Sequence, residues 1–198
     1  MKRKICKLFV IMSVIVMMMG VMTVSAGAKT KKITPKRLSK VEHTIWEESD
    51  ATTVKKGTYN VVVPRKKNKD SNFILEFKAP KTATYKFDVS NIKTSNDKEL
   101  LSGTFAFYKE YDPSPRYQNL ELIGDIKTQG GKNELGVLSF GNWNSNEDYS
   151  GPKDELSDAI TKKRYGKLKI NKGETVYIYF TTDGNKYGYI KSFTLKIK

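Results

Sequence analysis

Apolar side chains recur at every second position over most of residues 59–198, and this spacing limits what the chain can fold into. Phe73, Leu75 and Phe77 share one face of an extended segment, and Glu76 lies on the other. Successive side chains of a β-strand point to opposite sides, so this pattern is typical of strands buried on one face. The runs that carry it are 58–63, 73–78, 84–89, 105–107, 120–122, 137–140, 168–170, 176–180 and 189–197.

Helical periodicity is nearly absent from the same part of the chain. One short helix is expected in the 153–163 loop, where Leu156, Ala159 and Ile160 have helical spacing. Turns rich in Gly, Pro and Asn separate the alternating runs. We therefore predict an all-β protein, a single jelly-roll-like antiparallel β-sandwich of about eight or nine strands, formed by residues 57–198.

The first 28 residues have the three parts of a secretory signal peptide: a basic start, an uncharged stretch over 8–28, and small residues at Ala26 and Ala28. All six methionines and the single cysteine, Cys6, lie in this segment, so its removal leaves no thiol and no disulfide. We expect a secreted protein that is extracellular or associated with the cell surface. The uncharged stretch also has the length of a membrane span, so a retained anchor is the alternative. Residues 29–56 are basic and are expected to form a partly disordered lead-in.

The chain is strongly basic. Its net charge is +15, and removal of the signal segment, which has four basic residues and no acidic one, lowers this to +11. Such a charge attracts anionic cell-surface polymers, acidic glycans and other polyanions. Nearly all the positive residues are lysines, which lack the bidentate fork that arginine uses to recognise phosphates and bases. We therefore expect salt-sensitive attraction without specific recognition of nucleic acid; solubility is the alternative role of the charge.

Two segments are similar to a known family. Residues 72–89 read Asn-Phe-Ile-Leu-Glu-Phe-Lys-Ala-Pro-Lys-Thr-Ala-Thr-Tyr-Lys-Phe-Asp-Val, and residues 166–180 read Gly-Lys-Leu-Lys-Ile-Asn-Lys-Gly-Glu-Thr-Val-Tyr-Ile-Tyr-Phe. With the closing Phe-x-Leu-x-Ile at 193–197, they resemble the hairpins and final strand of bacterial pre-peptidase C-terminal domains. The resemblance implies a jelly-roll-like sandwich with a binding or targeting role. Residues 124–165 form an insertion that the family pattern does not contain.

Few residues suit catalysis. His43 is the only histidine, which excludes a site with several histidine ligands, and no Gly-x-Ser-x-Gly motif is present. We predict no catalytic residue and no enzymatic activity. The rival hypothesis is a small secreted hydrolase that uses the carboxylates of an acidic loop, because glycoside hydrolysis needs only two of them. The candidates are Glu147, Asp148, Asp154 and Glu155.

The insertion contains the strongest candidate ligand site. Trp143 and Tyr149 are close in sequence to Asn144 and Asp148. Aromatic rings stack on the apolar faces of sugars, while amides and carboxylates hydrogen-bond to the hydroxyls, so these four residues are predicted to bind a glycan. The alternative is that Trp143 closes one end of the sandwich and the asparagines form turns.

The leading hypothesis is a non-catalytic binding or adhesion module, monomeric, whose partner is a glycan or an anionic surface polymer. A structural or inhibitory role toward another exported protein stays open. No cofactor and no metal site are predicted. Oxygen-bearing side chains at alternate positions of 142–148 leave a structural Ca²⁺ as an alternative, although the sequence does not fit an EF-hand loop.

Overall fold

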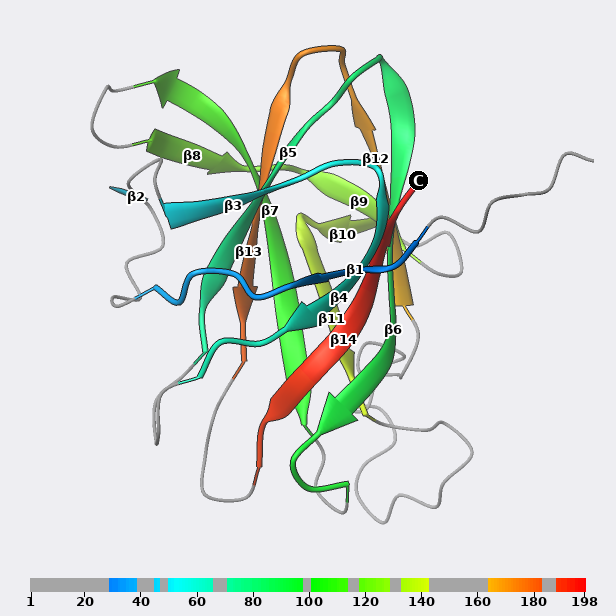
Figure 1. Cartoon of the computed structure of the whole chain (residues 1–198). Coiled ribbons are helices and arrows are strands. Elements are labelled where there is room, and N and C mark those ends of the chain that lie inside the picture. The colour runs from blue at the N-terminus through cyan, green and yellow to red at the C-terminus, as the bar shows by residue number, and fades with distance from the viewer. Residues whose placement is uncertain are drawn as a thin grey trace, which may run out of the picture.

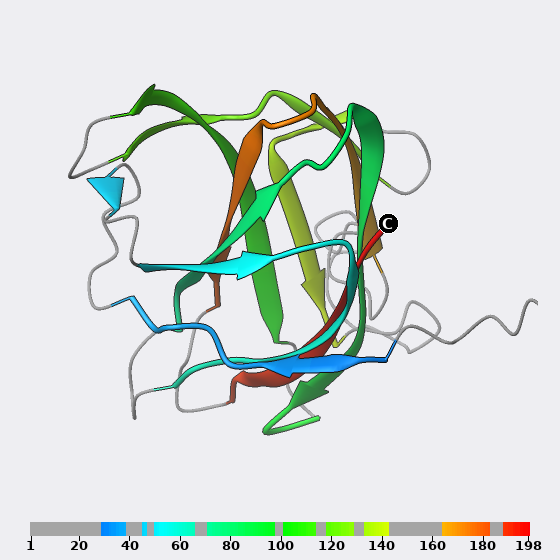
Figure 2. The same ribbon diagram turned by 45° about the horizontal axis from the view of Figure 1, so that its top comes forward.

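The computed structural model describes residues 29–38, 45–46, 50–65, 71–97, 101–113, 118–128, 133–142, 164–182 and 188–198. The fourteen elements that it assigns there are all strands, arranged in two facing sheets (Figures 1 and 2). The all-β sandwich expected from the alternating pattern is therefore confirmed.

Each sheet has seven strands, and we call them sheet A and sheet B. The order in sheet A is β1 (Lys31–Ile33), β4 (Gly57–Val62), β14 (Ile190–Ile197), β6 (Ala83–Thr94), β12 (Arg164–Ile170), β9 (Asp125–Thr128) and β10 (Asn133–Leu135). The order in sheet B is β2 (Ile45–Trp46), β8 (Gln118–Leu122), β7 (Ser102–Pro113), β13 (Thr175–Thr181), β5 (Phe73–Lys78) and β3 (Ala51–Val54), and β11 (Val137–Gly141) also pairs with β7. From β3 to β7, and again from β10 to β14, every connection passes from one sheet to the other.

The strand count and the strand directions differ from the prediction. All nine alternating runs are strands, but β1, β2, β3, β9 and β10 add five more, each two to four residues long. Strands this short contain too few positions for an alternating pattern to be recognised. The sheets are also not wholly antiparallel, because β1 pairs with β4, and β3 with β5, in parallel. The helix predicted at 153–163 lies outside the described residues.

The basic segment 29–56, expected to be a partly disordered lead-in, contributes β1, β2 and β3 to the sheets. Its Leu38 is buried on the outer face of sheet B and packs with Ile74, Tyr177 and Tyr179. The backbone N–H of Leu38 donates a hydrogen bond of 2.8 Å to the carbonyl oxygen of Asn72. The lead-in thus covers part of the outer face of sheet B.

Phenylalanine rings fill the space between the sheets. Phe105 of β7 is fully buried, and its ring centroid lies 5.1 Å from that of Phe140, 5.7 Å from Phe180 and 5.6 Å from Phe193. The rings come from both sheets and meet mostly edge to face, the arrangement that aromatic pairs favour. This core joins the two sheets, and the described residues contain no cysteine that could form a disulfide.

Candidate functional site

The outer face of sheet A is lined with lysines because of the same alternation that builds the core. In β12, Gly166, Leu168 and Ile170 are buried, whereas Lys167 and Lys169 between them are exposed. Strands β6, β9 and β14 alternate in the same way, so that their lysines also point outward. The lysines on this face include Lys86, Lys127, Lys167, Lys169, Lys196 and Lys198.

Four of these lysines are direct neighbours across four adjacent strands, and we call them the lysine row. Lys86 of β6 is opposite Lys167 of β12, and Lys167 is opposite Lys127 of β9. On the other side of β6, the backbone N–H of Lys86 donates to the carbonyl oxygen of Lys198 at 3.3 Å, and that of Lys198 donates back to Lys86 at 3.1 Å. The order across the sheet is therefore Lys198, Lys86, Lys167, Lys127.

The lysine row places like charges directly opposite one another at three successive antiparallel pairings. Neighbouring strands are about 4.8 Å apart, and opposed like charges destabilise a sheet by roughly 0.2–1 kcal/mol per pair. The cost is moderated because ammonium groups on long side chains stay in solvent. Even so, this arrangement concentrates positive charge at the expense of sheet stability.

One carboxylate and one aromatic ring hold the lysine ammonium groups in place. Asp88 lies on the same face, with Oδ2 at 3.2 Å from Nζ of Lys86 and 3.6 Å from Nζ of Lys198. The ring centroid of Tyr165 is 3.9 Å from Nζ of Lys86 and 5.6 Å from Nζ of Lys167. A cation over a tyrosine ring is attracted by the quadrupole of the ring. Three of the four lysines in the row thus have a fixed contact for the charged end.

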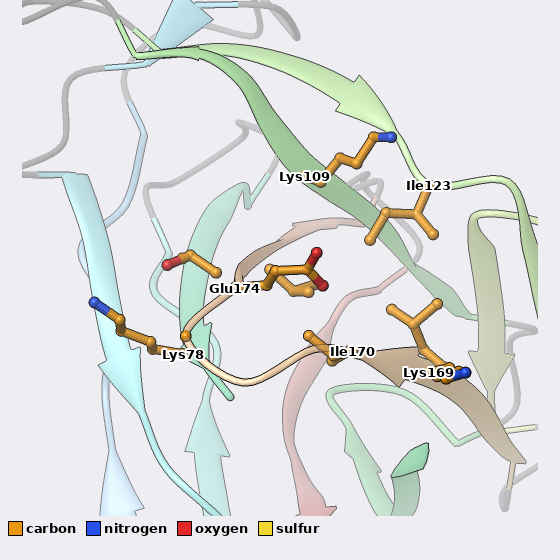
Figure 3. Close-up of a pocket in the computed structure, with 10 residues that line it drawn as sticks. Lys78, Lys109, Ile123, Lys169, Ile170 and Glu174 are labelled. Atoms are coloured by element: carbon orange, nitrogen blue, oxygen red, sulfur yellow. The ribbon is translucent and has the colours of Figure 1, made fainter. Parts of the chain in front are cut away.

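A pocket of about 440 Å³ adjoins this face at one end of the sandwich (Figure 3). Ile123, Ile170 and Val176 contribute apolar lining, and Lys169 belongs both to the pocket and to the outer face of sheet A. In Figure 3 the ammonium groups of the three lining lysines (Lys78, Lys109 and Lys169) are on separate sides of the rim, with Glu174 between them. The lysines of the pocket do not converge on one point, so the lysine row is the stronger candidate for an anion site.

The carboxylate of Glu174 is fixed by the turn that carries it. Oε2 accepts a hydrogen bond of 2.8 Å from the backbone N–H of Asn171, and Oε1 accepts one of 2.9 Å from Nδ2 of the same residue. The side-chain and backbone hydrogen bonds from Asn171 lower the pKa of Glu174, and the charge of Lys109 adds to this. Gly173 makes the turn possible, since its φ of 86° is a conformation that other residues rarely adopt. Its N–H donates to the carbonyl oxygen of Ala79, which joins this turn to the β5–β6 turn.

The residues that we predicted from sequence to bind a glycan lie outside the described residues. This applies to Trp143, Asn144, Asp148 and Tyr149, to the other acidic-loop candidates of the hydrolase hypothesis, and to His43. The glycan site therefore stays a prediction. The lysine row was not predicted from the sequence. Its signal is the Tyr-x-Lys-x-Lys run at 165–169 together with the lysines of β6, β9 and β14, but only the strand register shows that these residues are neighbours.

Metal and membrane sites were sought in the same described parts of the chain. No group of three or more His, Cys, Asp or Glu side chains there is placed to hold a metal ion. No helix in those parts has the length and apolar composition needed to cross a bilayer.

Comparisons with known proteins give little help with function. No protein-family model matches the chain, and no curated protein matches it significantly. One similar solved structure is CorA, a surface-associated copper-binding protein important in copper acquisition by Methylomicrobium album BG8. The alignment covers 86% of this chain and 99% of that chain, with 7% sequence identity and a TM-score of 0.35. A TM-score this low does not establish a shared fold, and the lysine row remains the main guide to function.

Proposed function

We propose that this protein is a non-catalytic binding module that works outside the cell and holds an anionic surface polymer on the outer face of sheet A. The observation that supports this proposal most is the lysine row, in which four lysines are opposed to one another across sheet A and Asp88 contacts two of them. A polyanion placed along the row turns repulsion between ammonium groups into attraction to shared anionic groups.

The opposed like charges of the row are the reason to connect it with function. Local rules of sheet stability are broken mostly at functional or strained sites of natural proteins. Threonine or glutamate opposite a lysine would stabilise the same strands better. The outer face of sheet B, in contrast, has Leu38, Ile74, Tyr177 and Tyr179 in a buried cluster, so the two broad faces of the molecule differ in chemistry.

The glycan site predicted at Trp143, Tyr149, Asn144 and Asp148 is compatible with this proposal as a second contact. A polymer of acidic sugars has rings for aromatic stacking as well as charges for lysines. The pre-peptidase C-terminal resemblance, with its implied binding role, likewise remains a hypothesis for the chain.

The proposal is tested by measuring affinity for soluble polyanions and for neutral dextran. Lys86→Gln/Lys167→Gln removes two charges from the row, while the matched control Lys55→Gln/Lys78→Gln removes two exposed charges elsewhere. At about 1 kcal/mol per lysine near an anionic surface, the row variant should bind at least about tenfold more weakly. The control should bind much as the wild type does.

Salt dependence gives a second measurement on the same variants. Each lysine that neutralises the polymer releases counterions, so the slope of log K against log salt should fall by about 0.7 per lysine removed from the row. Equal losses in the row variant and the control would mean that only overall charge matters, and would contradict the proposal.

A further inference from the structure

We infer that the polymer is an acidic polysaccharide with one carboxylate per sugar, and that a single extended chain of it crosses the strands along the lysine row. Tyr165 acts as a positioning residue for the two central lysines. This inference rests on the proposed function and adds to it the ligand class, the direction of the chain and the role of the ring.

The direction follows from the register. Lys86, Lys167 and Lys127 occupy paired positions on β6, β12 and β9, and Lys198, directly after the end of β14, pairs with Lys86 through backbone hydrogen bonds. The line through the four residues is therefore perpendicular to the strands. With neighbouring strands about 4.8 Å apart, the four lysines span about 14 Å. A linear ligand reaches all four only if it lies across the sheet, because along any one strand the charges are fewer.

The ligand class follows from the spacing and from the type of cation. One sugar ring of an extended chain is about as long as the gap between neighbouring strands, so a chain of four acidic sugars matches the length of the row. Each strand of duplex DNA has a charge about every 3.4 Å along its axis, which falls out of step with a 4.8 Å row. Lysine is also a point charge without the fork that arginine presents to a phosphate.

The Tyr165 ring and the Asp88 carboxylate position the lysines of the row before any ligand binds. Lys86 contacts both Asp88 and the Tyr165 ring, Lys198 contacts Asp88, and Nζ of Lys167 is 5.6 Å from the ring centroid. These contacts hold the charged ends of three lysines and reduce the entropy that long side chains lose when they bind. Phenylalanine at 165 would keep the attraction to the cations, whereas leucine would lose it.

The first test is a length series of oligogalacturonates, from two to eight sugars, measured by titration calorimetry. Affinity should rise steeply up to about four sugars, the number that the row can pair with, and only slowly beyond. A steady rise through eight sugars with no change of slope at four would overturn the linear site.

The second test compares two double variants of the same face and the same charge. Lys127→Gln/Lys167→Gln lies in the row, and Lys169→Gln/Lys196→Gln lies outside it. The in-row variant should weaken binding of the four-sugar probe at least about tenfold, and the off-row variant should do so less than about threefold. Equal losses would overturn the direction that we infer, while leaving binding by the face intact.

The third test addresses Tyr165 and the ligand class. Tyr165→Leu should weaken binding of the four-sugar probe several-fold with unchanged stability, whereas Tyr165→Phe should bind the probe as the wild type does. Equal binding by both variants would overturn the positioning role.

Tighter binding of inorganic polyphosphate than of oligogalacturonate would overturn the ligand class. Failure of every polyanion to bind would contradict the proposed function itself, which keeps the two failures distinguishable.

Discussion

At the scale of single residues, two tyrosines use their hydroxyl groups to close turns. The hydroxyl of Tyr85 donates to the carbonyl oxygen of Lys81 at 2.7 Å, and that of Tyr59 donates to the carbonyl oxygen of Lys55 at 2.9 Å. In both cases the partner is four residues earlier in the chain, and the ring is buried in the core. Each tyrosine therefore ties a turn to the strand that follows it.

Removing one of these hydroxyl groups should lower stability. Tyr85→Phe keeps the ring but leaves the carbonyl of Lys81 without this donor, and the expected loss is about 1–2 kcal/mol in the free energy of unfolding. Urea unfolding measures it, with Tyr165→Phe on the outer face of sheet A as the control. A loss of equal size in the control would show that the hydroxyl of Tyr85 has no special role.

The carboxylate of Glu174 gives a prediction about pH. Its pKa is lowered in the folded protein, so it stabilises the fold when ionised, and this contribution disappears as the pH falls and the carboxylate becomes protonated. Because the group is exposed and screened by solvent, Glu174→Gln should cost only about 0.5 kcal/mol at neutral pH. Stability curves of wild type and variant should converge in acid. A constant difference at all pH values would contradict the role of the charge.

At the scale of the strands, the opposed like charges of the lysine row should lower the stability of sheet A. Lys167→Thr removes two like-charge contacts and introduces a residue that favours strands, so it should raise the free energy of unfolding by about 0.5–1 kcal/mol. The gain should be larger at about 0.01 M salt than at about 1 M, where screening acts within about 3 Å. Destabilisation at low salt would show that the opposed lysines do not repel.

Long strands could be predicted from the sequence, but short strands and the pairing between strands could not. Phe73, Leu75 and Phe77 marked β5 because each is large and apolar at every second position. In contrast, β1 and β9 are three and four residues long and join sheet A through backbone hydrogen bonds, which leave little trace in side-chain pattern. The lysine row depends on pairing between segments distant in sequence, such as β6 with β12, so no local pattern contains it.

At the scale of the whole molecule, binding of a polymer to the outer face of sheet A should raise the thermal stability of the protein. A polymer that binds only the folded sheet stabilises it by about 2.7 kcal/mol at a concentration of 100 times Kd, which raises Tm by roughly 5–10 °C for a chain of this size. Thermal unfolding with polygalacturonate at low salt measures this shift. The Lys86→Gln/Lys167→Gln variant should show little of it, and an equal shift in that variant would place binding elsewhere.

The position of Lys198 has a practical consequence for anyone who handles this protein. Residue 198 belongs to the lysine row, so a peptide fused directly after it would lie next to the face that we propose binds the polymer. An aspartate-rich epitope tag joined there would act as a tethered competitor, present at a high effective concentration. An acidic purification handle or label attached directly after residue 198 would then compete with the proposed polymer for the same lysines.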